Sequence, residues 1–462
     1  MIVRARETAS RSGPLLLLGL VAVILVSWPS GADAQAWKAG ERLAQEWDVK
    51  AEKMNEHLLP TMREHGVDMW IIMSRENNPD PALDLFGDFG ISGWYGQRNA
   101  YVFTDPGTGD DLETVVFGTH LSQHLDEFYD RIVSYHGDRE GLAPLIREYV
   151  HEEDPETIAI NQSRTISMAD GLTAAMKEYL ENAIGPEYSS RLVSSEPMFI
   201  DYVSRRTQGE LEIERQASEI TWNILRRAFS NEVITPGETT LMDLHWWIVN
   251  EWKSQDLELN FPPGLDIQRR GVDGSIGDGE NPTIRPGDVL HVDFGVKLMG
   301  LVTDQQKMAY VLKPGEEEPP EGLKEAFANS VRGGEFLVEE LKPGVKGYQV
   351  MERAERRARA QGLDADIYPH VQGNWVHGVG AWGSPRWPER YGIHPKEPVR
   401  PTEFWSIEYS VTTAVPEWGG QEVSMAREED ARVTEDGDVE YLTGPQEELW
   451  LIRTPSDSGG DR

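Results

Sequence analysis

The stretch DVLHVDFGVKLMGLVTDQQKMAYV, residues 288–311, contains two apolar strand-like runs with one aspartate each. Asp293 lies inside the first run, and Asp304 lies in the returning run after a glycine that marks a turn. A tight turn centred between Leu298 and Met299 makes the two aspartates direct cross-strand neighbours. Like charges in that position repel each other, and a cation between them removes the cost. The stretch therefore predicts a hairpin that holds a cation.

The same pattern recurs near the C-terminus. The strand-like run FWSIE, residues 404–408, ends in Glu408, and the returning run of residues 422–428 ends in Glu428. Their midpoint falls on Trp418, which opens a Trp-Gly-Gly turn, so these glutamates also face each other across a hairpin. Solvent-facing acids are the alternative explanation for either pair alone, because the chain is so acidic.

His377 is the candidate that completes the set. It lies in the segment VHGVG, whose glycines let the backbone approach a ligand closely. An imidazole and four carboxylates form a donor set suited to two Mn, Co, Fe or Zn ions. Two such ions activate a water molecule and polarise a carbonyl group, which is hydrolytic chemistry. A purely structural histidine is the alternative.

Composition limits the other functions. The chain has 462 residues with 79 acidic and 44 basic side chains, a formal net charge of −35. That length predicts two or three domains. The strong negative charge argues against a nucleic-acid partner, because phosphate binding requires clustered Lys and Arg. The absence of cysteine excludes disulfides, thiol nucleophiles and thiolate metal sites.

Residues 1–34 have the layout of a secretory signal peptide. Three arginines precede an apolar run from Leu15 to Val26, and the small-residue triplet Ala32-Asp33-Ala34 follows. The run is too short to span a bilayer comfortably, so no stable membrane span is expected after cleavage. We predict a mature chain that begins at Gln35 and is periplasmic or secreted.

The pattern of elements predicts two domains after the signal peptide. Residues 37–205 alternate strand-like and helical segments, which is typical of an α/β domain. Residues 206–453 combine long helices with hairpins, an α+β signature, and begin with the capping box Thr207–Glu210. We predict loops over residues 261–286, which are rich in Gly, Pro and Asp, and a flexible tail over residues 454–462.

The ordered set Asp293, Asp304, His377, Glu408 and Glu428 resembles the pita-bread metallopeptidase family, which includes methionine aminopeptidase, Xaa-Pro aminopeptidase, prolidase and the metal-free creatinase. The resembling segments are DVLHVDFGVKLMGLVTDQQKMAYV, HGVG, FWSIEYS and REEDARVTEDG. The family pattern HGxG corresponds to His377–Gly380. Glu429 adjoins Glu428, but the spacing to Val433–Gly437 favours Glu428 as the last ligand.

The resemblance implies an α/β N-terminal creatinase-like domain and an α+β C-terminal pita-bread catalytic domain. It implies two divalent metal ions. Manganese is the preferred identity of these ions, and zinc, cobalt and iron are the alternatives. Asp293 would chelate one ion, Asp304 and Glu428 would bridge, and His377 and Glu408 would complete the other. It further implies a homodimer that cleaves the peptide bond before proline by a metal-bridging hydroxide.

The residues near His377 depart from the family pattern. Family peptidases usually carry a histidine four residues before the ligand histidine and often another seven residues after it. Here Gly373 and Ser384 stand at those positions. We predict that His370 substitutes as the donor to the oxyanion and that Glu408 shuttles the proton. The alternatives are a metallohydrolase of another amide or ester and a non-catalytic binding module with the same fold.

Overall fold

The computed structural model describes residues 31–86, 98–109, 111–118, 125–135 and 141–455, and divides the chain into two units, Met1–Arg42 and Leu43–Arg462. Residues 1–30 of the expected signal peptide lie outside the described residues, as do residues 456–462 of the expected tail. Export of the chain therefore stays a prediction. Within the described ranges, no helix combines the length and apolar character needed to cross a membrane.

The N-terminal half is built on a mixed six-stranded sheet of spatial order β4-β3-β2-β1-β5-β6. Its strands are β1 (Met69–Arg75), β2 (Arg98–Thr104), β3 (Glu113–Gly118), β4 (Arg131–Ser134), β5 (Ile158–Ile160) and β6 (Leu192–Ser194). The helical elements are α1 (Gly31–Lys53), α2 (Leu59–Glu64), α3 (Leu142–Glu153), α4 (Ala174–Ile184), α5 (Pro186–Ser189) and α6 (Glu196–Ser204), with a π-helical turn, η1 (Met54–Leu58), and 3₁₀ turns η2 (Pro81–Leu85), η3 (Leu125–Glu127) and η4 (Ser167–Ala169).

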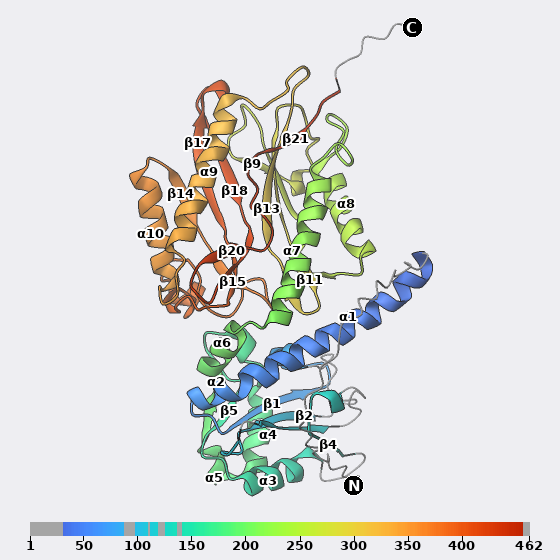
Figure 1. The fold of residues 1–462 in the computed structure, drawn as a ribbon, viewed down its shortest axis with the longest axis vertical. Helices are drawn as coiled ribbons and strands as arrows, with labels where there is room; N and C mark the ends of the chain where they lie inside the picture. The colour runs from blue at the N-terminus through green and yellow to red at the C-terminus, as the bar shows by residue number, and fades with distance from the viewer. Residues whose placement is uncertain (1–30, 87–97, 110, 119–124, 136–140, 456–462) are drawn as a thin grey trace, which may run out of the picture. The chain divides into compact units, whose positions relative to one another are not determined.

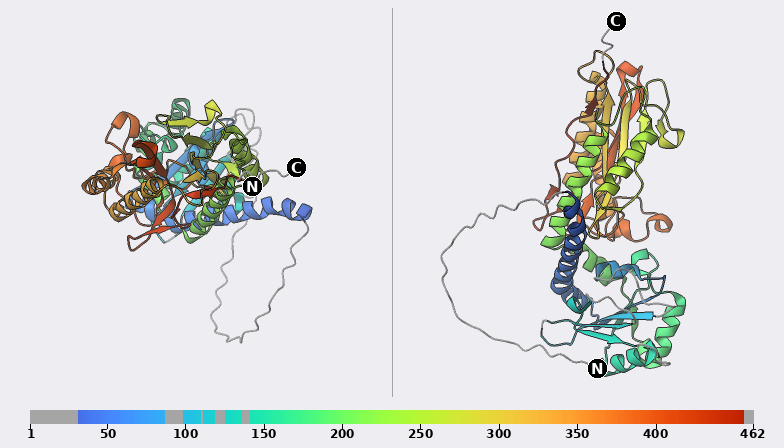
Figure 2. Two further views of the ribbon diagram at one scale, coloured as in Figure 1. Left: turned by 90° about the horizontal axis from the view of Figure 1, so that it is seen from above. Right: turned by 90° about the vertical axis from the view of Figure 1, so that its right-hand side faces the viewer.

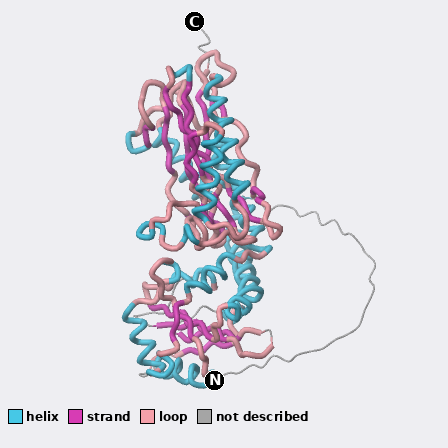
Figure 3. The backbone as a smooth tube through the Cα atoms, turned by 90° about the vertical axis from the view of Figure 1, so that its left-hand side faces the viewer, coloured by secondary structure: helices cyan, strands magenta, loops and turns pink. Residues whose placement is uncertain are grey.

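Helices cover both faces of this sheet (Figure 3). Successive side chains of a strand point to opposite faces, so β1 serves two cores. Trp70 and Ile72 pack in a core with residues of α1, α2 and α6, whereas Ile71 and Met73 pack in a second core with residues of α3 and α4. The predicted α/β class of this half is confirmed.

Pro60 does not interrupt the helical segment that begins with α1. The π-helical turn η1 leads into α2, and Pro60 lies in the first turn of α2. A proline is tolerated there because the first N–H groups of a helix need no partner within the helix.

The C-terminal half places long helices on both sides of its strands. Figure 1 shows α7 and α8 on one side and α9 and α10 on the other, and Figure 2 shows α7 running along the strands. The helical elements are α7 (Gln208–Ala228), α8 (Leu241–Ser254), α9 (Glu321–Glu340), α10 (Gly347–Ala360) and α11 (Pro388–Tyr391), with 3₁₀ turns η5 (Asp278–Glu280), η6 (His394–Lys396) and η7 (Pro416–Trp418). The predicted capping box is present: Thr207 caps α7 and Glu210 returns to its backbone N–H.

Four sheets make up the strands of this half, with orders β21-β13-β10-β8-β9, β12-β11-β7, β14-β17-β18 and β15-β16-β19-β20. The strands are β7 (Glu258–Leu259), β8 (Gly264–Gln268), β9 (Ser275–Gly277), β10 (Val289–Phe294), β11 (Val296–Leu298), β12 (Leu301–Val302), β13 (Gln305–Val311), β14 (Asp364–Ile367), β15 (His370–Gln372), β16 (Phe404–Ser406), β17 (Tyr409–Val415), β18 (Gln421–Arg427), β19 (Asp430–Val433), β20 (Val439–Tyr441) and β21 (Trp450–Ile452).

The prediction of loops over residues 261–286 is wrong, because β8 and β9 lie there. Leu265 and Ile267 alternate with more exposed residues, and their side chains are buried in the core beneath α7 and α8. Pairing of β8 with the buried strand β10 supplies the hydrogen bonds of this short segment. β10 is distant from β8 in the sequence. The prediction therefore followed the Gly and Pro residues around β8, which are typical of loops.

The first predicted hairpin forms with a register shifted by two residues. Asp293 pairs with Gln306 rather than with Asp304. The turn residues are Met299 and Gly300, both with positive φ, of 47° and 81°, which is a type I′ turn one position beyond the expected centre. Asp304 therefore lies diagonally from Asp293 on the opposite strand, which is still close enough for the two side chains to interact.

Candidate metal centre

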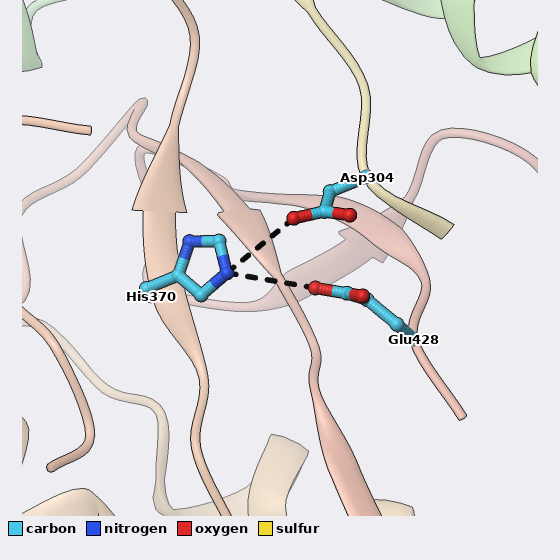
Figure 4. A group of neighbouring side chains, drawn as sticks. All are labelled: Asp304, His370 and Glu428. Atoms are coloured by element: carbon cyan, nitrogen blue, oxygen red, sulfur yellow. Dashed lines mark ion pairs between the residues drawn. The ribbon is translucent and has the colours of Figure 1, made fainter. Parts of the chain in front are cut away.

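Three buried side chains from distant parts of the C-terminal half converge on one point: Asp304, His370 and Glu428 (Figure 4). Nε2 of His370 lies 3.6 Å from Oδ2 of Asp304 and 3.5 Å from Oε1 of Glu428. Oε2 of Glu408 lies 3.7 Å from the same nitrogen. One imidazole nitrogen therefore faces three carboxylates.

Strand pairing places each of these groups. His370 opens β15 and pairs with Ser406 of β16, and the Ser406 hydroxyl donates a hydrogen bond to Glu428. Tyr409 pairs with Arg427 at the end of the β17–β18 hairpin, so Glu408 and Glu428 are the next residues along the two strands. This confirms the predicted alignment of the second hairpin.

Asp304 follows β12 and is positioned by a hydrogen bond to Asp430. Its backbone N–H donates to Oδ1 of Asp430 over 2.9 Å. The carboxylate of Asp430 also accepts hydrogen bonds from the side chains of Gln305 and Gln372, at 2.6 Å and 2.8 Å. A buried polar layer therefore fixes the backbone at Asp304 against β15 and β19.

The donor atoms fit a divalent cation. Nδ1 of His370 lies 3.2 Å from the carbonyl oxygen of Val371, which only accepts hydrogen bonds, so Nδ1 carries the proton and Nε2 presents a lone pair. That nitrogen is buried without a hydrogen-bond partner, as are Oδ1 of Asp304 and Oδ1 of Asp293. Buried acceptors left without a partner are costly, and divalent cations bound beside them would remove that cost.

The electrostatics of the carboxylates support the same conclusion. Burial, together with the negative charge of Glu428, raises the pKa of Asp293 to about 7 and that of Glu408 to about 9. Burial and the same charge hold the pKa of Asp304 well above its usual range. The cluster therefore lacks positive charge, and a mixed N/O donor set is typical of Mn, Fe, Co or Zn sites.

The two candidate histidines occupy places different from those expected. His370, predicted as an oxyanion donor, lies among the carboxylates and is fully buried. His377, predicted as a metal ligand, is exposed in the segment after β15, and its ring centroid lies 4.6 Å from that of His370. The roles of both residues stay predictions.

The adjacent residues Glu428 and Glu429 point in different directions. Glu428 faces the centre, whereas Glu429 points away and pairs with Lys307 at 2.5 Å and with Arg427 at 3.3 Å. Successive residues of a strand point to opposite faces, which explains why only one of the two can take part.

Sequence reasoning missed two residues beside the centre, Gln306 and His291. The Gln306 side chain contacts both Glu408 and Glu428, and His291 contacts Gln306. The spacing in the sequence could have indicated both residues. His291 lies two residues before Asp293 and Gln306 two residues after Asp304, and residues two apart in an extended segment point to the same face.

Comparison with known structures identifies the fold class. X-Pro aminopeptidase from Thermotoga maritima MSB8 matches with 16% identity and a TM-score of 0.62, covering 85% of this chain and 100% of that chain. Xaa-Pro dipeptidase from Bacillus anthracis matches with 16% identity and a TM-score of 0.58, covering 87% and 99%. Prolidase from Pyrococcus horikoshii OT3 matches with 17% identity and a TM-score of 0.55, covering 87% and 99%.

These likenesses define a prolidase-like fold, in which an α/β domain precedes a pita-bread domain. The sequence matches no curated protein. Residues 212–435, which contain every residue of the centre, match the model of Metallopeptidase family M24. This part of the chain is therefore an M24 metallopeptidase domain.

Proposed function

We propose that this protein is a metal-dependent peptidase that cleaves the peptide bond before proline. The observation that carries the proposal is the buried Asp304–His370–Glu428 group within an M24 domain. The solved structures that share the fold include an X-Pro aminopeptidase and a prolidase, which supports the Xaa-Pro class. At these identities the likeness concerns the fold, so the substrate belongs to the proposal.

We assign His370, rather than His377, as the imidazole ligand. Counted from His370, the segment HVQG takes the place of the family's HGxG, with Val371 in place of the first glycine. His377 then lies seven residues further on, where the family often has its second histidine. The geometry agrees, because the unpartnered Nε2 of His370 faces the carboxylates.

The ion would be held by Asp304, His370, Glu428 and Glu408, and Asp293 lies beside Asp304. Manganese is the first candidate for this ion. A bound divalent ion would supply Lewis-acid polarisation of the scissile carbonyl and lower the pKa of a water molecule. Glu408 retains 26% side-chain exposure, so it can reach both the solvent and the substrate. In this position Glu408 accepts the proton of the attacking water and delivers it to the leaving nitrogen.

His377 would assist from the exposed side of the centre. Its ring lies 5.5 Å from Trp382 and 6.3 Å from Tyr368, measured between ring centroids. An N–H of His377 can donate to the carbonyl oxygen as negative charge develops on it. The two aromatic rings form an apolar wall against which a proline ring packs.

The roles of the two histidines are tested by a matched pair of alanine variants. His370→Ala should lose bound manganese, because it removes the only imidazole of the group. His377→Ala should keep the metal and lower kcat on an Xaa-Pro dipeptide by about 10² to 10³-fold, with little change in KM. Metal loss in His377→Ala with retention in His370→Ala would reverse the assignment.

Substrate class is tested with the same preparation. Rates on Xaa-Pro peptides should exceed those on matched Xaa-Ala peptides and on simple esters. Asp366, rather than a histidine, stands four residues before His370, which is the observation that favours a different amide or ester as the second candidate. Turnover of those substrates alone would favour this candidate, and metal binding without any turnover would indicate a binding module.

A further inference from the structure

Gln306 occupies a central position among the acids of the metal centre. Its Nε2 donates to Oε1 of Glu408 over 3.0 Å and to Oε2 of Glu428 over 2.8 Å. Its Oε1 lies 3.0 Å from Nε2 of His291, whose Nδ1 lies 2.8 Å from Oδ2 of Asp266. A side-chain amide therefore connects two carboxylates of the centre to a histidine outside it.

The orientation of this amide follows from its neighbours. With a cation bound, both glutamates are ionised, and an ionised carboxylate accepts hydrogen bonds and donates none, so the NH₂ group of Gln306 must face Glu408 and Glu428. The oxygen then faces His291, which donates to it. Gln306 consequently presents hydrogen atoms, not a lone pair, to the acids and offers no ligand to a cation there.

The two carboxylate oxygens of each glutamate have different partners. Oε1 of Glu428 and Oε2 of Glu408 face His370, at 3.5 Å and 3.7 Å, whereas the other oxygen of each binds Gln306. One cation position therefore has four donors, supplied by the two glutamates, His370 and Asp304.

A second position would have far fewer donors. Only Oδ1 of Asp293 and Oδ1 of Asp304 remain buried without a partner on that side. In the described part of the chain, the group of Asp304, His370 and Glu428 is the single set of three or more ligand-type side chains that converges closely. Two aspartate carboxylates without an imidazole make a weaker site for a divalent ion than the four donors of the first position.

We propose that the Gln306 amide takes the place of a second cation, so that the centre binds one divalent ion tightly and a second one much more weakly. The inference rests on the proposed function and refines it, because it replaces the two equivalent ions expected from the sequence. Hydrogen bonds to charged groups of this kind predict a roughly 10- to 100-fold weaker second site.

The test is a manganese titration of the full chain after chelator treatment, followed by calorimetry and by metal analysis after gel filtration. The wild-type protein should retain one ion per chain. Gln306→Ala frees one oxygen of each glutamate, so the second ion should bind roughly 10- to 100-fold more tightly. Gln268→Ala is the matched control, because Gln268 is a buried strand glutamine whose side chain bonds the backbone of Ser424, outside the metal centre.

The outcomes separate the two proposals. Two ions of equal affinity in the wild type would overturn the inference and leave the metallopeptidase proposal intact. One ion in both the wild type and a folded Gln306→Ala variant would remove Gln306 from this role. No tightly bound ion in the wild type would overturn the metal centre itself, and the inference with it. The wild-type result stands even if the variant fails to fold.

Discussion

At the scale of single residues, the neighbouring glutamates Glu428 and Glu429 have opposite surroundings. Glu428 faces the imidazole of His370, whereas Glu429 accepts a hydrogen bond from buried Lys307 and pairs with Arg427. In the proposed function, Glu428 therefore serves the metal centre, whereas Glu429 serves the packing of β13 against β18.

Two conservative variants should separate these tasks. Glu428→Gln should abolish tight metal binding while the chain stays folded, because it removes a charge that the site needs. Glu429→Gln should keep the metal but lower the free energy of unfolding by about 3 kcal/mol or more, since it leaves the buried cations Lys307 and Arg427 without their anion. Metal analysis and guanidinium unfolding measure both effects, and metal loss in Glu429→Gln would contradict the assignment.

Asp80 illustrates a buried acid that lies outside the centre. Its Oδ1 accepts hydrogen bonds from the backbone of Ala82 and the side chain of Asn161, while Oδ2 is buried without a partner. Burial raises the pKa of Asp80 to about 7, although both hydrogen bonds act in the opposite direction. The folded protein therefore keeps this proton over a range in which the unfolded chain has released it.

This pKa predicts a pH-dependent stability. Between about pH 4 and pH 7 the folded state binds more protons at Asp80 than the unfolded state does, so the free energy of unfolding falls as pH rises. Asp80→Asn removes that dependence and should stabilise the protein by roughly 1 to 3 kcal/mol at pH 8, with little effect near pH 4. Urea unfolding at several pH values measures it. Asp84→Asn, an exposed position on the same 3₁₀ turn, is the control, and equal effects of both variants would refute the prediction.

At the scale of elements, the connection from β10 to β11 passes unusually close to the returning strand. A side chain at Gly295 would collide with the backbone carbonyl of Thr303. The hydroxyl of Thr303 accepts a hydrogen bond from the N–H of Val296 over 3.0 Å. This close approach sets the path of the chain into Asp304.

Gly295→Ala should therefore act on both stability and the metal centre. The added methyl group must push the strands apart, so we expect the free energy of unfolding to fall by about 2 kcal/mol or more and metal affinity to weaken. Gly279→Ala is the control, because nothing lies within 4 Å of a methyl group at that position. Denaturant unfolding and metal titration of the two variants provide the measurement, and indistinguishable behaviour would contradict this account of the connection.

At the scale of the whole molecule, one buried ionic group joins elements far apart in the chain. Glu210 at the start of α7 binds Lys53 of α1 at 3.0 Å and Arg206 at 2.7 Å. Arg206 also donates to the backbone of Gln372 and to the side chain of Asn374, in the segment that leads from His370 to His377. Burial lowers the pKa of Lys53 to about 7. The group therefore connects the N-terminal domain, α7 and the metal centre.

Removal of the shared anion should be costly. Glu210→Gln leaves two cations buried without their partner, and we expect the free energy of unfolding to fall by about 3 to 5 kcal/mol. Lys53→Met should cost less, because the Glu210–Arg206 pair remains. Glu181→Gln, which breaks the surface pair with Lys177, should have a much smaller effect. Equal losses for Glu210→Gln and Glu181→Gln in denaturant unfolding would rule out this role.

Much of the architecture was predictable from local patterns. Five strands of the N-terminal sheet, the helices α7 to α10 and the capping box at Thr207 each have a period or a spacing that their own residues specify. The alignment of Glu408 with Glu428 was predictable too, because the turn at Trp418 lies midway between them. The short strands β8 and β9 were missed, because their stability comes from β10 rather than from their own composition.

The sequence by itself determined the family pattern, the order of the acids and the presence of two acid-bearing hairpins, because these depend on residue type and spacing. Only the tertiary structure decided which histidine faces the acids. The segment HGVG around His377 has the stronger local signal, but pairing of β15 with β16 brings His370 to Ser406 and Glu428 and leaves His377 exposed. The same is true of Gln306, whose part in the centre depends on a register set by the positive φ of Met299. Such choices depend on contacts between segments far apart in the chain, and these contacts exist only after the chain has folded.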